Sequence, residues 1–287
     1  MESKASAPGK VILFGEHFVV YGVKAVLCAI NKRVTVTAEK IKENIISIQS
    51  NIGNLELEPN KNVSEIDSPL KPFYYLANKI IQNKNTGIKI KVESEIPLGA
   101  GLGSSSACCV AGAAAISRLF SNTSKEEILG LAIEAEKTIF QNTSGADCTI
   151  CTFGGIMEYD KKTGFSKIKF ESNFHLVIAN SNIKHSTKLI VKDVKLFKKN
   201  NIKGLGGKIN ENQIYLETIG ISNEKIRKMI QIGKESSFGA KITGAGGGGC
   251  VFALTDDTNL NETIKQFREN NYECFSVKID LEGLNTF

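Results

Sequence analysis

The sequence lacks the features that mark membrane-spanning and secreted proteins. It contains no apolar run long enough to cross a membrane. Residues 1–10 show neither the charged nor the apolar region of a signal peptide. We therefore expect a cytoplasmic protein without a membrane partner.

Zinc-binding patterns are also absent, although the chain has seven cysteines. The number is odd, and Cys108 and Cys109 are neighbours in an apolar stretch. We expect these thiols to be reduced and mostly buried.

A strong charge of one sign is missing as well. The formal net charge of +6 comes from basic residues that are spread among acids along all 287 residues. This pattern favours a solvated basic surface that serves anionic ligands, so we expect no nucleic-acid partner. The chain is longer than one core usually organises, which predicts two domains.

No low-complexity linker or internal repeat divides the chain, and residues 44–68 are its one polar interval. Strand-like and helix-like segments alternate in both halves, which predicts an α+β fold. Strands are expected at 11–14, 34–39, 87–95, 174–179, 250–254 and 274–279, and helices at 107–120, 125–140, 222–234 and 260–270.

The most informative segment is a glycine-rich turn between a strand and a helix. Gly99, Gly101 and Gly103 run into the serines at 104–106 and then into a small-residue helix. A helix start directs unpaired N–H groups and a positive dipole end at one point, which suits a phosphate. The alternative is a plain helix entry whose small residues serve close packing. The turn is neither a Walker A loop nor a dinucleotide fingerprint, so a nucleotide site here needs another fold.

The helix expected at 125–140 carries an acidic residue on its apolar face. Ser124, with a glutamate three residues later, predicts a capping box at its start. At about 100° per residue, Glu136 falls in the apolar arc together with Phe140, whereas Glu134 points to solvent. A buried carboxylate is costly unless it is paired or binds a metal. Glu136 is therefore a metal ligand, a partner of a structural cation, or a residue at the rim.

Two further charged residues could complete a phosphoryl-transfer site. Asp147 follows a polar turn, and Lys10 opens an apolar strand near the N-terminus. Such a site needs backbone donors for phosphates, oxygen ligands for Mg²⁺, a carboxylate near the acceptor hydroxyl and a fixed cation. For Lys10, a surface position at a strand start is the commoner alternative.

Three separated segments together resemble the GHMP small-molecule kinase superfamily and, within it, the mevalonate kinases. They are residues 7–22 (APGKVILFGEHFVVYG), the glycine-rich turn with its serines at 97–107 (PLGAGLGSSSA) and residues 241–250 (KITGAGGGGC). The resemblance covers nearly the whole chain except about 41–67 and the loop around 200–212. In the third segment, four consecutive glycines indicate a close backbone approach to the active site.

The resemblance implies a two-domain GHMP kinase fold of the α+β class. Residues 1–169 would form an N-terminal domain like domain 2 of ribosomal protein S5, and residues 170–287 a ferredoxin-like C-terminal domain. The implied activity is the phosphorylation of (R)-mevalonate by ATP to 5-phosphomevalonate, in isoprenoid biosynthesis. The alternatives are a phosphomevalonate kinase or another GHMP kinase, and a catalytically silent relative. A homodimer is left open.

The resemblance also implies the roles of single residues. Asp147 would be the base or orienting carboxylate for the acceptor hydroxyl, with Lys10 close by, and Ser105 and Glu136 would hold Mg²⁺. The residues expected around the ATP phosphates are Gly99, Ala100, Gly101, Leu102, Gly103, Ser104, Ser105 and Ser106. Those expected near the substrate are Glu16, His17, Val20, Ser144 and Thr187.

One position departs from the pattern of the mevalonate kinases. His185 precedes Ser186 and Thr187 where some of them carry arginine. A largely neutral histidine would bind a substrate carboxylate less well. For the phosphomevalonate alternative, Lys184, Lys188 and Lys192 are candidate ligands of a substrate phosphate.

Overall fold

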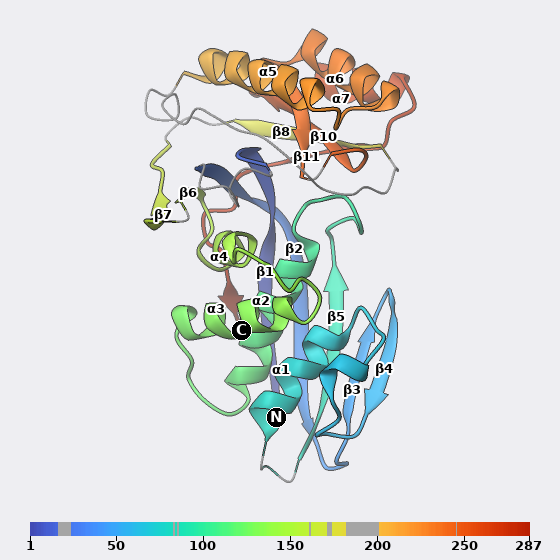
Figure 1. Ribbon diagram of the computed structural model, residues 1–287, viewed down its shortest axis with the longest axis vertical. Helices are drawn as coiled ribbons and strands as arrows, with labels where there is room; N and C mark the ends of the chain where they lie inside the picture. The colour runs from blue at the N-terminus through green and yellow to red at the C-terminus, as the bar shows by residue number, and fades with distance from the viewer. Residues whose placement is uncertain are drawn as a thin grey trace.

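The computed structural model describes residues 1–16, 24–82, 84, 86–160, 162–170, 174–181, 201–244 and 246–287. These residues build two β-sheets, each covered by helices (Figure 1). The architecture confirms the predicted α+β class. Within these ranges, no helix is both long and apolar enough to cross a lipid bilayer.

Two long antiparallel strands, β1 (Glu2–Phe14) and β2 (Ala25–Ile41), form the centre of the first sheet. Both are longer than predicted, because β1 begins with small and polar residues and β2 with a continuous apolar run, and neither stretch shows an apolar alternation. The order is β12-β1-β2-β5-β3-β4, with β6 pairing with the start of β2 and β7 with β6. The other strands are β3 (Ile46–Ser50), β4 (Gly53–Leu57), β5 (Gly87–Ser94), β6 (Ile156–Asp160), β7 (Gly164–Lys167) and β12 (Asn285–Thr286).

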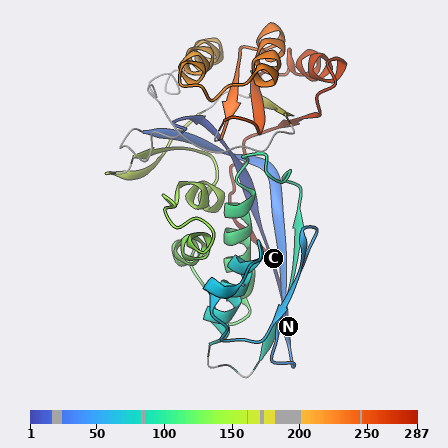
Figure 2. The same cartoon turned by 45° about the vertical axis from the view of Figure 1, so that its right-hand side comes forward.

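Four helices cover one face of this sheet (Figure 2). They are α1 (Lys71–Ile81), α2 (Ser104–Arg118), α3 (Lys125–Lys137) and α4 (Ala146–Phe153). The central helix is α2, which packs against the other three and against β1 and β2 because its side chains are small. The predicted helices at 107–120 and 125–140 are confirmed, although α3 ends at Lys137 and Phe140 beyond it is exposed. Helix α4 lies where the sequence showed only an apolar stretch.

The second sheet contains four antiparallel strands in the order β11-β8-β10-β9. Three helices lie on its outer side, away from the first sheet (Figure 1). This strand order is that of a ferredoxin-like βαββαβ unit, except that two helices, α5 and α6, lie between β8 and β9 instead of one. The elements are β8 (His175–Asn180), α5 (Ile202–Thr218), α6 (Glu224–Ser236), β9 (Gly239–Thr243), β10 (Cys250–Thr255), α7 (Leu260–Glu269) and β11 (Cys274–Val277).

Two segments that the sequence left without assignment are ordered elements. The polar interval 44–68 contains β3, β4 and the 3₁₀ helix η2 (Val63–Glu65). Residues 202–212 belong to α5. Both were missed because their apolar residues are few and their stability comes from packing against neighbouring elements.

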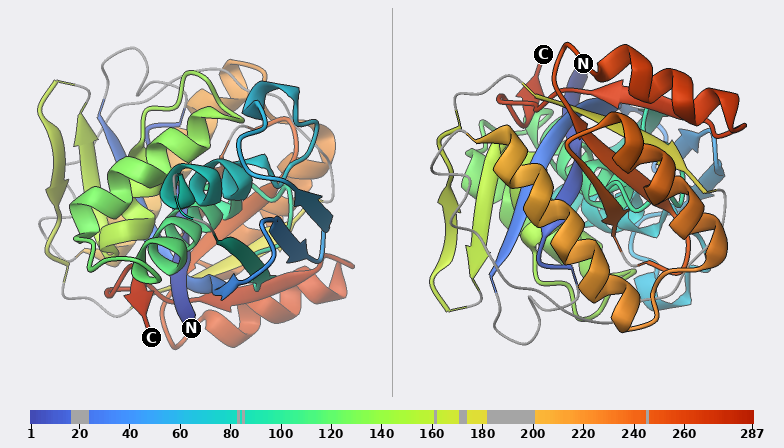
Figure 3. Two further views of the ribbon diagram at one scale, coloured as in Figure 1. Left: turned by 90° about the horizontal axis from the view of Figure 1, so that it is seen from below. Right: turned by 90° about the horizontal axis from the view of Figure 1, so that it is seen from above.

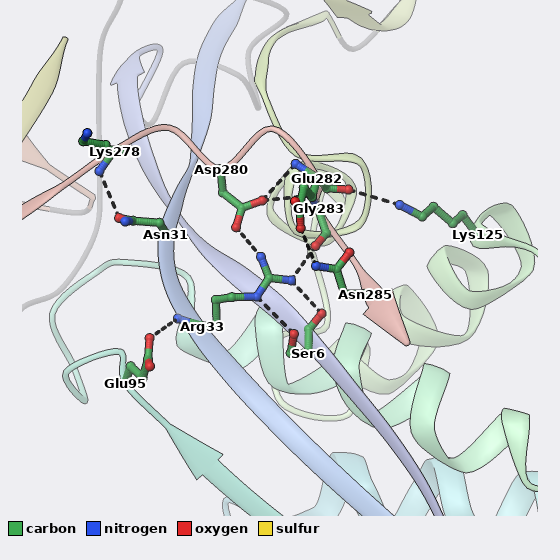
Figure 4. A network of polar contacts seen from close by, with 10 residues as sticks. All are labelled: Ser6, Asn31, Arg33, Glu95, Lys125, Lys278, Asp280, Glu282, Gly283 and Asn285. Atoms are coloured by element: carbon green, nitrogen blue, oxygen red, sulfur yellow. Dashed lines mark hydrogen bonds and ion pairs between the residues drawn. The ribbon is translucent and has the colours of Figure 1, made fainter. Parts of the chain in front are cut away.

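After β11 the chain returns to the first sheet, where β12 pairs with β1 and the two termini lie close together (Figure 3). Arg33 of β2 fixes this return by binding the Asp280 carboxylate and the carbonyl oxygens of Ser6 and Gly283 (Figure 4). The N–H of Leu284 donates to the carbonyl of Thr152 at the end of α4 (2.9 Å). The first sheet therefore includes residues from both sides of the predicted boundary at 169/170, and that boundary stays a prediction.

Candidate active site

The glycine-rich turn ends at the N-terminus of α2. Gly103 is the N-cap of this helix, with φ +75° and without a side-chain cap, so the first N–H groups of α2 are free of a local acceptor. Gly99 and Gly101 also have positive φ, at +68° and +76°. A Cβ on Gly103 would lie 2.6 Å from Cγ of Lys10, so this position also demands glycine for packing.

A cleft of about 540 Å³ opens in front of this turn. Its walls come from the turn and the first turn of α2 on one side, and from the loop between α3 and α4 on the other. All eight residues expected around the ATP phosphates line it, as do Lys10, Glu136, Ser144 and Asp147. The structure therefore brings the predicted phosphate, metal and catalytic residues to one cavity.

Lys10 and Asp147 form an ion pair at the base of the cleft. Lys10 Nζ lies 3.0 Å from Asp147 Oδ2, and the side chains are 5% and 34% exposed, so Asp147 faces the cavity. The backbone N–H of Lys10 donates to the carbonyl of Leu102 (2.8 Å), which ties β1 to the glycine-rich turn. Asp147 is placed by the first turn of α4.

Glu136 projects from α3 into the wall of the cleft and is 3% exposed. Its two oxygens accept hydrogen bonds from the hydroxyls of Ser106 and Thr143. Burial raises the pKa of Glu136, the two hydrogen bonds oppose this rise, and the negative charge of Asp147 adds to it. The partners of this carboxylate include neutral hydroxyls, and no lysine or arginine pairs with it among the described residues.

In α2, the hydroxyl that donates to Glu136 is that of Ser106, whereas the resemblance pairs Glu136 with Ser105. Ser105 lines the cleft at the preceding position of α2, and its role as a metal ligand stays a prediction. Thr143 was missed, because no local pattern shows that a loop residue after α3 turns back to this helix.

The second sheet reaches the same region through β9 and the glycine segment that follows it. A Cβ on Gly244 would lie 3.3 Å from Cα of Gly101, so the two glycine segments are in backbone contact. The N–H of Ile12 in β1 donates to Oγ1 of Thr243 (3.2 Å). The expected close approach of the third segment to the site is therefore present in the geometry.

Glu16 does not line the cleft, although it was predicted to lie near the substrate. It is 1% exposed, and its Oε1 pairs with the ammonium of Lys241 in β9, which is fully buried. Burial raises the pKa of Glu16 and lowers that of Lys241, and the opposite charge of each partner counteracts the shift. Lys241 was quoted only as part of a motif, and its pairing with Glu16 was not foreseen.

Of the remaining predicted substrate residues, the structure places Ser144 alone. His17, Val20 and Thr187 lie outside the described residues, as do His185 and the lysines at 184, 188 and 192. Ser144 borders the cleft, and its hydroxyl accepts a hydrogen bond from the N–H of Ala146 (3.3 Å), which helps to start α4. Their substrate roles stay predictions.

A helix start with free N–H groups, a buried lysine, a carboxylate open to the cavity and a buried carboxylate are the parts that a phosphoryl-transfer site needs. Family models agree with this class: the GHMP kinases N terminal domain matches residues 71–155, and the GHMP kinases C terminal matches residues 193–273. The chain belongs to the GHMP kinase family.

Within this family, the chain is similar to proteins named mevalonate kinase. The one from Pyrococcus furiosus is 33% identical, with 99% of this chain and 98% of that protein covered. The crystal structure of the Methanococcus jannaschii mevalonate kinase has a TM-score of 0.83 at 29% identity and covers 96% of this chain and 98% of that one. The L. major mevalonate kinase in complex with R-mevalonate has the same fold, with a TM-score of 0.82 at 23% identity, covering 97% and 96%.

Proposed function

We propose that this chain is a kinase that transfers the γ-phosphoryl group of ATP to (R)-mevalonate, giving 5-phosphomevalonate. The observation that carries the proposal is the single cleft in which the N-terminus of α2, the Lys10–Asp147 pair and Glu136 meet. The choice of mevalonate is supported by relatives of that name that match nearly the full length of the chain.

The ATP phosphates bind at the glycine-rich turn and the first turn of α2. The free N–H groups there donate to phosphate oxygens, and the helix dipole favours their negative charge. The glycines at 99, 101 and 103 leave the backbone without side chains that would keep the phosphates away.

The wall around Glu136 fits Mg²⁺. This cation prefers oxygen ligands and uses one or two carboxylates together with substrate phosphates. Glu136 and the hydroxyls beside it supply such oxygens, and the described residues contain no group of three or more acids, histidines or cysteines that could hold a metal ion by itself. Glu136 holds the ion, with Ser105 as the second candidate. When bound, Mg²⁺ neutralises charge on the phosphate oxygens.

Asp147 receives the acceptor hydroxyl. Its carboxylate faces the cavity, where it orients the hydroxyl towards the γ-phosphorus and accepts the proton as the new bond forms. In a loose transition state little base strength is needed, so orientation and charge contribute more than proton abstraction. Lys10 holds Asp147 in place and adds a fixed positive charge beside the transferred group.

An ADP-release assay with mevalonate, phosphomevalonate, homoserine and galactose tests the substrate. We expect turnover with mevalonate and little with the other three. A preference for phosphomevalonate would leave the site intact and change the substrate, and no turnover with any of them would refute the kinase. A cytoplasmic location and the oligomeric state remain separate expectations, to be tested by fractionation and by light scattering.

A further inference from the structure

Glu16 and Lys241 form a fully buried ion pair between the two sheets. Glu16 lies two residues after the end of β1, and Lys241 is the central residue of β9, 225 positions further along the chain. Gly15 has φ +104°, and a Cβ there would lie 2.3 Å from Cα of Ala25, so only glycine allows the chain to turn here. This turn places Glu16 against the second sheet.

A second contact ties the same two strands together. The hydrogen bond from Ile12 to Thr243 joins β1 to the last residue of β9. Gly244, the next residue, touches Gly101 of the ATP-binding turn. The ion pair and this hydrogen bond therefore hold β9, and with it Gly244, next to the ATP-binding turn.

Stability alone does not account for the pair. Removing two charges from water costs several kcal/mol per ion, and apolar residues of similar volume often stabilise a protein as well or better. The ammonium of Lys241 also lies 5.4 Å from the centre of the Phe252 ring, which compensates part of the cost. Glu16 Oε2, by contrast, is buried without a hydrogen-bond donor among the described residues.

We propose that Glu16 and Lys241 are positioning residues that fix the distance between the ATP-binding turn and the glycine segment after β9. In this role Glu16 holds the second sheet against the ATP-binding turn and does not contact the acceptor. The inference rests on the proposed function for its kinetic effects, whereas its effect on nucleotide binding is independent of the acceptor.

The test is a double-mutant cycle with Glu16→Met, Lys241→Met and the combined variant. Each single change leaves an unpaired buried charge and lowers the thermal midpoint, whereas the combined variant regains most of it. Lys91→Met is the control, because Lys91 forms an exposed ion pair with Glu93 on β5, away from the cleft. Calorimetry with ADP and steady-state kinetics are measured on all four variants.

For a positioning role, the combined variant binds ADP several-fold more weakly and has a kcat lower by about tenfold to a hundredfold despite its regained stability. Recovery of both ADP affinity and kcat in the combined variant would overturn the proposal, since the pair would then serve stability only. A raised KM for mevalonate in Glu16→Met, with unchanged ADP affinity in both single variants, would overturn it in favour of a substrate contact. Should wild-type enzyme not use mevalonate, the ADP measurements still decide the role of the pair.

Discussion

Two buried carboxylates in this protein, Glu136 in the cleft wall and Glu16 between the sheets, have different partners. Glu136 accepts hydrogen bonds from two neutral hydroxyls, so its negative charge is not compensated by a lysine or arginine among the described residues. Glu16 is compensated by the ammonium of Lys241. Burial raises the pKa of both. Two carboxylates of similar burial therefore have different environments. Glu136 has the free charge that the proposed metal site needs, and Glu16 is fixed in the interface by Lys241.

The third acid, Asp147, should show the largest effect, because it alone combines a lysine partner with exposure to the cleft. We expect Asp147→Asn to lower kcat by at least about a hundredfold while ATP still binds. Single-turnover kinetics and calorimetry measure the two properties separately. Asp160→Asn, at the last residue of β6 and outside the cleft lining, is the control. A kcat near that of the wild type would remove Asp147 from the mechanism.

Glu136→Gln tests the role of the carboxylate that has no lysine or arginine partner among the described residues. Loss of the charge should raise the Mg²⁺ concentration at half-saturation by roughly tenfold or more, because ligating oxygens hold Mg²⁺ mainly through their charge. Equilibrium binding of Mg·ADP at varied Mg²⁺ gives a readout apart from activity. Glu134→Gln is a matched control on α3, where Glu134 pairs with Lys79 at the surface. An unchanged Mg²⁺ titration would show that Glu136 is not a ligand.

Thr143→Val tests the neutral hydroxyls that orient Glu136. It keeps the shape of the side chain and removes one of the two donors, so the Mg²⁺ half-saturation should rise by up to about tenfold, less than in Glu136→Gln. Thr138→Val removes a hydroxyl that binds only the carbonyl of Ala135 and is the control. The same Mg·ADP titration serves for both variants, and equal values for them would contradict an orienting role of Thr143.

The last prediction concerns two cysteines and not the activity, because burial is the largest cause of their pKa shifts and nearby charges contribute less. Burial raises the pKa of Cys28 and of Cys250 to about 12. Little thiolate then exists at pH 8, so these thiols should react roughly a thousandfold more slowly than in the unfolded chain. Thiol titration with and without denaturant measures this difference. Rapid labelling of Cys28 or Cys250 in the native protein would contradict this prediction, because it would show that the thiol is accessible to the reagent.

Much of the cleft could be predicted from the sequence. The alternation in β5, the three glycines and the small side chains of α2 are local patterns, and they correctly indicated a strand, a turn and a buried helix. The capping box at Ser124 and the inward direction of Glu136 followed from helical periodicity. These features were accessible because they depend on residues within a few positions of one another.

Other features could not be predicted, since each depends on segments that meet only after folding. Thr143 belongs to a loop whose path is set by α3 and α4, and α5 has few apolar residues of its own. The return of the chain end to β1 depends on Arg33, which binds Ser6 and Asp280 from distant parts of the sequence.

The sequence by itself determined the glycine-rich turn before α2, the inward direction of Glu136 on α3 and the membership of the kinase family, because short-range patterns and motif order encode them. Only the tertiary structure decided which hydroxyls bind Glu136 and that Asp147 forms an ion pair with Lys10 at 3.0 Å. It also decided that Glu16 pairs with Lys241 and lies outside the cleft. The physical reason is that the environment of a charge depends on the burial and the partners that sheet and helix packing create.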